Sequence, residues 1–144
     1  MCPLSGPLSR NLAALIYPPP KRVAVLGASP DPHRPSHGVS LELLHWGYEV
    51  FPVRPAVATL FGRPCYATLA QVPRPVDIVD VFRRSEHVGS HLPEILALHP
   101  RVLWLQDGVR DDAAAEIARA AGIVVVQDDC LARRILELRS AHAS

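Results

Sequence analysis

The residues from Lys21 to Gly38, which read KRVAVLGASPDPHRPSHG, predict an anion site. The apolar run at residues 22–26 is typical of a strand buried on both faces. Gly27 lets the chain leave that strand in a tight turn, where the backbone approaches a ligand without a Cβ in the way. Ser36 is predicted to cap the helix that follows. Because the first N–H groups of a helix lack partners within it, a phosphate or carboxylate is the favoured ligand.

Three arginines are predicted to lie near this loop. Arg34 is within it, Arg54 follows the second predicted strand, and Arg83 follows the third. The planar fork of arginine bonds phosphate oxygens in pairs. Each of these residues taken alone is more often a solvated surface cation. Their convergence at strand ends favours an anion site.

The spacing of the loop argues against an ordinary dinucleotide site. Gly27 is followed by Ala28, Ser29 and a proline, and the next glycine is Gly38, so the GxGxxG fingerprint fails after its first member. Arg54 stands where an acidic residue would bond the ribose. A cation there suits a ribose with an extra phosphate, so CoA with its 3′-phosphate and NADP with its 2′-phosphate are both candidates.

The sequence contains two pairs of histidines, but neither pair indicates a metal site or a catalytic base. His33 and His37 are four residues apart, as are His87 and His91, but no HExxH pattern and no third ligand accompany them. We interpret all four as solvated side chains. No nucleophile beside a base is found, so no catalytic residue is predicted.

The acidic residues are also assigned structural roles. Asp77 and Asp80 are predicted in one strand on opposite faces, and Asp128 and Asp129 are expected to cap the last helix. Lys21 is the single lysine, so a phosphoacceptor site with a lysine after the last strand is excluded.

Composition indicates one globular domain of 144 residues, with 49% hydrophobic residues and a net charge of +1. A net charge this small argues against nucleic-acid binding, which would require a strongly basic surface. No apolar run approaches the ~20 residues that a membrane-spanning helix requires. The spacing of the three cysteines indicates neither a disulfide framework nor a CxxC site, so we expect the protein to lie in a reducing cytoplasm. Cys130 is expected to be buried and inert.

Alternating apolar runs and amphipathic segments predict an α/β fold. We expect a doubly wound, Rossmann-like parallel sheet of about five strands with helices on both faces, in three layers. Residues 1–20 are predicted to form a helical extension to a domain at 21–144. The helix containing Pro93 is expected to begin near Ser90, since proline is tolerated in the first turn. The predicted strands are 22–26, 48–53, 76–82, 101–106 and 123–127, with a minor strand at 63–66.

Five motifs together resemble those of the small stand-alone CoA-binding proteins, which are similar to the CoA-binding domain of the succinyl-CoA ligase α subunit. In chain order they are GASPDPHRPSHGV, VFPVRP, VDIVDVFRR, WLQDGV and VVVQDDC, and the resemblance spans about residues 20–131. It implies a Rossmann-like sheet with CoA lying across the strand ends.

The resemblance also implies a role for each site residue. Gly27, Ala28 and Ser29 would hold the pyrophosphate, together with Arg34 and the backbone near Gly38. Val53, Arg54 and Pro55 would flank the adenosine and its 3′-phosphate. Phe82, Arg83 and Gln106 would line the route of the pantetheine, although a plain core role for Phe82 also fits its sequence context.

We therefore expect a cytoplasmic module that binds CoA or an acyl-CoA without catalysis of its own, as a carrier or a regulatory partner of an unidentified protein. An NADP-dependent oxidoreductase or another nucleotide-binding domain is the alternative. A structural domain with a vestigial cleft is a third possibility.

Overall fold

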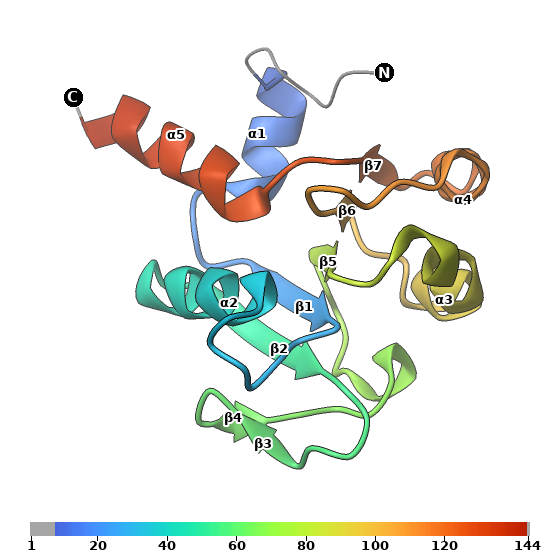
Figure 1. Cartoon of the computed structure of the whole chain (residues 1–144). Coiled ribbons are helices and arrows are strands. Elements are labelled where there is room, and N and C mark those ends of the chain that lie inside the picture. The colour runs from blue at the N-terminus through green and yellow to red at the C-terminus, as the bar shows by residue number, and fades with distance from the viewer. Residues whose placement is uncertain (1–7, 144) are drawn as a thin grey trace.

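The computed structural model describes residues 8–143, and its centre is a five-stranded parallel sheet (Figure 1). The strands in spatial order are β2 (Glu49–Val53), β1 (Arg22–Leu26), β5 (Ile78–Val81), β6 (Val102–Leu105) and β7 (Val124–Val126). The order reverses between β1 and β5, which confirms the predicted doubly wound topology. A ligand is therefore expected beyond the carboxyl ends of these two strands.

Helices cover both faces of the sheet and complete the predicted three layers (Figure 1). One face carries α2 (Pro35–His45) and α5 (Leu131–Ala143), and α1 (Arg10–Ile16) packs into the same apolar cluster. The other face carries α3 (Ser85–Leu98) and α4 (Asp112–Ala120). None of the helices in the described part of the chain is long and apolar enough to cross a membrane.

Alternation along the strands divides the core into two apolar clusters. Val79 and Leu103 point into the α3 and α4 side, whereas Val23 and Trp104 point into the α2 and α5 side. Trp104 is fully buried, and its indole N–H donates to the Asp129 carbonyl at 2.9 Å. This bond ties the start of α5 to the centre of the sheet.

The segment after β2 differs from the predicted minor strand. Residues Thr59–Leu60 (β3) and Arg63–Pro64 (β4) form a short antiparallel hairpin, whereas only one minor strand, at 63–66, was predicted. Tyr66 then makes an isolated parallel bridge to Val53, and a 3₁₀ turn, η1 (Leu69–Gln71), leads toward β5. The hairpin and η1 extend the wall beside the end of β2.

Two predictions about helix starts were wrong. The helix α3 begins at Ser85, five residues earlier than expected, so Pro93 lies inside it. Pro93 and Gly89, the residue four positions earlier, are both exposed, so water can reach the carbonyl that lacks a helical partner. The helix α2 begins at Pro35, with Arg34 as its N-cap residue and no capping side chain, so Ser36 lies in the first turn.

Glycines after α2 and α4 take the predicted left-handed conformation. The φ of Gly47 is 91° and that of Gly122 is 90°, and each residue lies just before the next strand. These turns send β2 and β7 back into the sheet.

Candidate functional site

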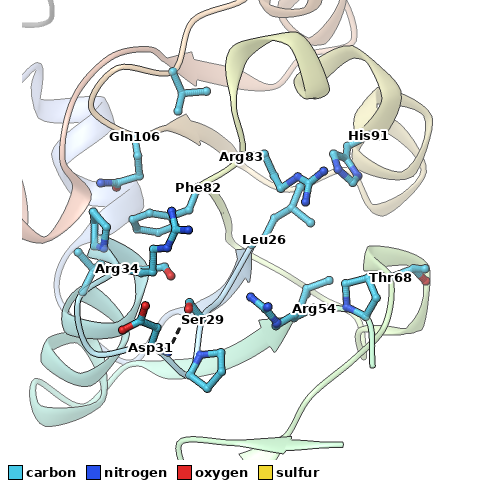
Figure 2. A pocket seen from close by; sticks show the side chains of 18 of the residues that line it. Leu26, Ser29, Asp31, Arg34, Arg54, Thr68, Phe82, Arg83, His91 and Gln106 are labelled. Carbon is cyan, nitrogen blue, oxygen red and sulfur yellow. Dashed lines mark hydrogen bonds between the residues drawn. The ribbon is translucent and has the colours of Figure 1, made fainter. Parts of the chain in front are cut away.

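A cavity of about 940 Å³ opens at the point where the strand order reverses, and Figure 2 shows many of its side chains. This volume lies near the upper end of the range for small-molecule sites, so it suits a large ligand. The wall comprises Leu26, Gly27, Ser29, Pro30, Asp31, Arg34, Pro35, Ser36, Val39, Val53, Arg54, Pro55, Ala67, Thr68, Phe82, Arg83, His91, Glu94, Gln106, Asp107, Val109 and Cys130.

Gly27 shapes the floor of the cavity. Its φ is +88°, and a Cβ built on it would lie 3.0 Å from the Phe82 carbonyl oxygen and 3.3 Å from Arg83 Cδ. The absence of a side chain thus lets the exit of β1 pass close to the exit of β5. The N–H groups of Gly27 and Ala28 both donate to the Val53 carbonyl, at 3.1 and 3.3 Å. The role of Gly27 is therefore to let the two strand exits lie close together. Its own N–H already donates to the Val53 carbonyl and is not available to a ligand.

Donors for an anion come from the next part of the loop. The Ser29 hydroxyl accepts from the Asp31 N–H at 3.1 Å, which folds the loop toward the start of α2. The backbone N–H of Ser29 has no hydrogen-bond partner among the described residues. The first turn of α2 also lacks a capping side chain, and Pro35 and Ser36 of that turn line the cavity. This end of the helix is a favourable environment for a phosphate.

The three predicted arginines all line the cavity (Figure 2). Arg54 Nη1 lies 3.5 Å from the Ala28 carbonyl, and the Arg83 side chain points toward the α3 side of the cavity, where His91 lies (Figure 2). Among the described residues, no carboxylate forms an ion pair with Arg34, Arg54 or Arg83. Their charges therefore remain available to a ligand.

The acidic side chains of the cavity have other partners. Asp31 accepts from the His33 N–H at 2.9 Å, and Glu94 bonds His91 at 3.2 Å. Asp107 accepts two hydrogen bonds of 3.1 Å from Arg133, and these bonds to the carboxylate raise the pKa of the Arg133 guanidinium. These acids on the wall therefore have partners of their own, whereas no described carboxylate pairs with any of the three arginines.

Nine of the eleven residues predicted for the site line the cavity. They are Gly27, Ser29, Arg34, Val53, Arg54, Pro55, Phe82, Arg83 and Gln106. The other two do not line it. Ala28 is fully buried, and Gly38 lies in α2, where a Cβ would meet nothing within 4 Å.

His91 and Glu94 line the cavity, although the sequence analysis interpreted His91 as a solvated histidine. His91 Nδ1 lies 3.2 Å from Glu94 Oε2, while its Nε2 is buried and has no partner in the structure as described. The three-residue spacing of this pair on a helix was the available signal. His91 was interpreted only as one of a pair with His87, so its spacing to Glu94 was not used. The partner histidine of the sequence analysis, His87, is exposed and lies outside the wall.

The opposite end of the cavity lies at the start of α5. Gln106 Oε1 accepts from the Leu131 N–H at 3.1 Å and so caps this helix. Asp128 and Asp129, which were expected to cap this helix, make other contacts. Asp128 Oδ1 accepts from the Gly108 N–H, while the buried Asp129 carboxylate pairs with Arg133 and Arg134 and accepts from the Cys130 N–H.

Cys130 is half-buried and lines the cavity, so the expectation that it would be buried and inert was wrong in its first part. Its place in the wall follows from the cap of α5, since Cys130 immediately precedes Leu131. The sequence does not show which side chains of the segment between β7 and α5 face the sheet, so it could not place Cys130 in the wall.

Taken together, these features suit an elongated anionic ligand. Three arginines with no carboxylate partner in the described part of the chain surround the Gly27 loop. An apolar wall that includes Leu26, Val39 and Phe82 continues from this loop. No group of three or more potential metal ligands exists among residues 8–143. The fold and the cavity therefore define a Rossmann-like domain with a strand-end site suited to a phosphorylated ligand.

Comparison with known proteins names the family. Residues 21–135 match the model of the CoA binding domain, and the chain belongs to this family. It is 37% identical over 111 residues to the uncharacterized protein YneT of Bacillus subtilis, covering 77% of this chain and 82% of that one. A solved structure from Thermus thermophilus, cell-free ID.343, is 43% identical with a TM-score of 0.85, covering 90% of this chain and 97% of that one. The predicted family and fold are thus confirmed.

A more distant relative is an enzyme. The chain is 23% identical over 122 residues to an ADP-forming acetate–CoA ligase of Archaeoglobus fulgidus, and the match covers 78% of this chain. The chain spans 18% of the length of that ligase. The homology is to the CoA-binding region of such ligases, which are similar to the succinyl-CoA ligase that the sequence motifs indicated.

Proposed function

We propose that this chain binds CoA, or an acyl-CoA, in the strand-end cavity and acts as a non-catalytic carrier or regulatory module. The observation that carries the proposal is the set of three arginines, free of acidic partners, around the Gly27 loop in a chain of the CoA-binding domain family. CoA has a pyrophosphate, a 3′-phosphate and a long amide-containing arm. The cavity offers cations, donors and an apolar wall to these three parts.

In this proposal the pyrophosphate lies against the loop, near Ser29, Arg34 and the first turn of α2. The adenosine with its 3′-phosphate lies near Val53 and Arg54, at the end of β2. The arm then passes Phe82 and Arg83 toward Gln106. This arrangement follows the order in which the groups occur along the CoA molecule.

The non-catalytic role is part of the proposal. It is supported by the short match to the ligase, because the chain corresponds to about one fifth of that enzyme. The free thiols of Cys65 and Cys130 support a reducing location such as the cytoplasm. An NADP-dependent oxidoreductase remains the alternative, since Arg54 would also suit a 2′-phosphate.

Isothermal titration with CoA, dephospho-CoA, NADP, NAD and ATP tests the proposal. We expect CoA to bind most tightly. The Arg54→Ala substitution should weaken CoA binding by roughly 10- to 100-fold, since a hydrogen bond to a charged group contributes about 1.5–3 kcal/mol. The same variant should change dephospho-CoA binding much less.

Arg74→Ala is the matched control, because Arg74 is exposed and lies outside the cavity. It should leave CoA affinity unchanged. Tighter binding of NADP than of CoA would favour the oxidoreductase. Equal loss of CoA and dephospho-CoA affinity in Arg54→Ala would refute the 3′-phosphate assignment.

A further inference from the structure

The end of the cavity at α5 contains a thiol and an amide donor that the binding of phosphates does not use. Cys130 lines this end and is half-buried. Gln106 lines it too, from the carboxyl end of β6, and Figure 2 shows its side chain at the opposite side of the cavity from Arg54 and Thr68. Gln106 bonds the backbone of Leu131, the residue that follows Cys130 in the chain.

The orientation of the Gln106 amide indicates a ligand at this end. Its Oε1 accepts from the Leu131 backbone N–H at 3.1 Å, and a backbone N–H requires an acceptor, so the amide nitrogen must occupy the other position. That nitrogen has no partner among residues 8–143, although Gln106 is only 4% exposed. Because Gln106 lines the cavity, its amide N–H₂ is suited to a carbonyl acceptor on a ligand.

The arm of CoA has such acceptors, since it contains two amide carbonyls and ends in a thiol. With the phosphates at the Gly27 loop, as proposed above, the arm would run toward Gln106 and bring its sulfur toward Cys130. We propose that Cys130 is a thiol–disulfide exchange site for CoA disulfides. This inference rests on the proposed function, because it requires the nucleotide end to bind in the cavity.

The exchange balances without any further oxidant. The Cys130 thiolate attacks one sulfur of a CoA disulfide, the Cys130–CoA sulfur bond forms, and the original disulfide bond breaks. The second CoA leaves as a thiolate and takes up a proton from solvent. One disulfide is consumed and one is formed, so the ligand itself is the oxidant. A thiol later restores Cys130 by the reverse reaction.

Cys65 is the natural comparison. It lies outside the cavity wall, its thiol donates to the Arg54 carbonyl at 3.7 Å, and burial raises its thiol pKa. A raised pKa lowers the thiolate fraction and slows attack on a disulfide. Cys2 lies outside the described residues and is replaced by serine in every protein of the test.

The test incubates the Cys2→Ser protein with CoA disulfide and follows adduct formation by intact mass. We expect one CoA adduct per chain, mapped by peptide analysis to Cys130. The Cys65→Ser variant should react at the same rate, and Cys130→Ser should form no adduct. Adduct on Cys65, or an equal rate in Cys130→Ser, would overturn the inference.

A second comparison separates binding-promoted exchange from general thiol reactivity. Cystamine is a small disulfide without a nucleotide, and we expect CoA disulfide to react at least tenfold faster. Arg54→Ala should reduce this advantage, whereas Arg74→Ala should retain it. Equal rates for both disulfides would contradict a site built for the CoA arm.

Titration of the Cys2→Ser protein with reduced CoA separates the two possible failures. Binding of reduced CoA with no adduct from CoA disulfide would overturn the exchange site alone. No binding of reduced CoA would overturn the proposed function, and the exchange site with it.

Discussion

At the scale of single residues, the arginines at the strand ends were predictable, whereas several other residues of the cavity were not. Arg54 and Arg83 each follow a strand whose apolar run is clear in the sequence, so the shared edge of a parallel sheet brings them together. His91 and Cys130 depend instead on the phase of a helix and on how its start packs. A linear pattern carries little information about either.

Asp80 lies in a strand, as predicted, but its complete burial was not predicted. It lies in the centre of β5, paired in register with Val25 and Trp104, and is fully buried. Neither of its carboxyl oxygens has a hydrogen-bond partner in the described structure. Burial therefore raises the pKa of Asp80 well above its ordinary value.

This burial makes stability depend on pH in a definite direction. The folded state keeps the Asp80 proton that the unfolded chain releases above about pH 4. The free energy of unfolding therefore has its full contribution from protonated Asp80 below that pH. This contribution is lost as the pH rises toward the pKa of Asp80 in the folded state. The asparagine side chain of Asp80→Asn does not ionise, so this pH-dependent contribution is absent from the variant.

We expect Asp80→Asn to gain stability relative to the parent protein as the pH rises from 4 to 8. The gain should not exceed about 1.4 kcal/mol per pH unit within the titrating window. Urea unfolding at a series of pH values measures it. A difference that stays constant across this range would show that Asp80 is ionised in the folded protein.

At the scale of elements, the strands were predicted because each is a short apolar run closed by turn residues. The predicted strand at residues 22–26 coincides with β1, and the other four main strands are shorter than predicted by one to three residues. The hairpin β3–β4 was missed because two-residue strands carry no periodic signal. The start of α3 was missed because Pro93 usually marks a first turn, and here it does not.

The turn between β1 and the loop provides a direct test of the close packing at the cavity floor. Gly27→Ala puts a Cβ at positive φ and 3.0 Å from the Phe82 carbonyl. We expect it to destabilise the protein by about 1–3 kcal/mol and to weaken CoA binding, because Phe82 and Arg83 must move.

Gly38→Ala is the contrasting substitution. Gly38 lies inside α2 with open space around it, so alanine should stabilise the protein by up to about 1 kcal/mol through helix propensity. Thermal unfolding compares the two variants. Similar effects of both substitutions would mean that the floor of the cavity is less closely packed than the structure shows.

At the scale of the whole molecule, the sheet reversal gathers contributions from distant parts of the chain into one cavity. The wall includes residues from Leu26 to Cys130, and loops from both sides of the reversal meet there. The chain has a net charge of +1, so the positive character of the site comes from local placement of arginines. We therefore expect ligand binding to respond to individual arginines more than to total charge.

The helix α1 belongs to the packed molecule, although it precedes the family match. Ile16 is fully buried, Leu12 is 8% exposed, and the Tyr48 hydroxyl donates to the Ile16 carbonyl at 2.6 Å. The burial that accompanies this contact raises the pKa of the Tyr48 phenol. These contacts place α1 against α5 and the sheet, away from the residues that line the cavity.

Substitution of Ile16 tests this docking. Ile16→Ala should lower the free energy of unfolding by about 2–5 kcal/mol, as in other cores, while the folded variant retains its CoA affinity. Asn11→Ala, at an exposed position of the same helix, should change stability by no more than about 0.5 kcal/mol. Denaturant unfolding that leaves Ile16→Ala as stable as Asn11→Ala would contradict the docking of α1.

The central claim is that CoA occupies the cavity at the sheet reversal, and amide chemical shifts measured during titration with CoA test it most directly. We predict that the largest changes occur at Ser29, Arg54, Arg83 and Gln106, with small changes along α4. Saturable changes confined to residues outside the cavity wall, or no changes at millimolar CoA, would contradict the claim.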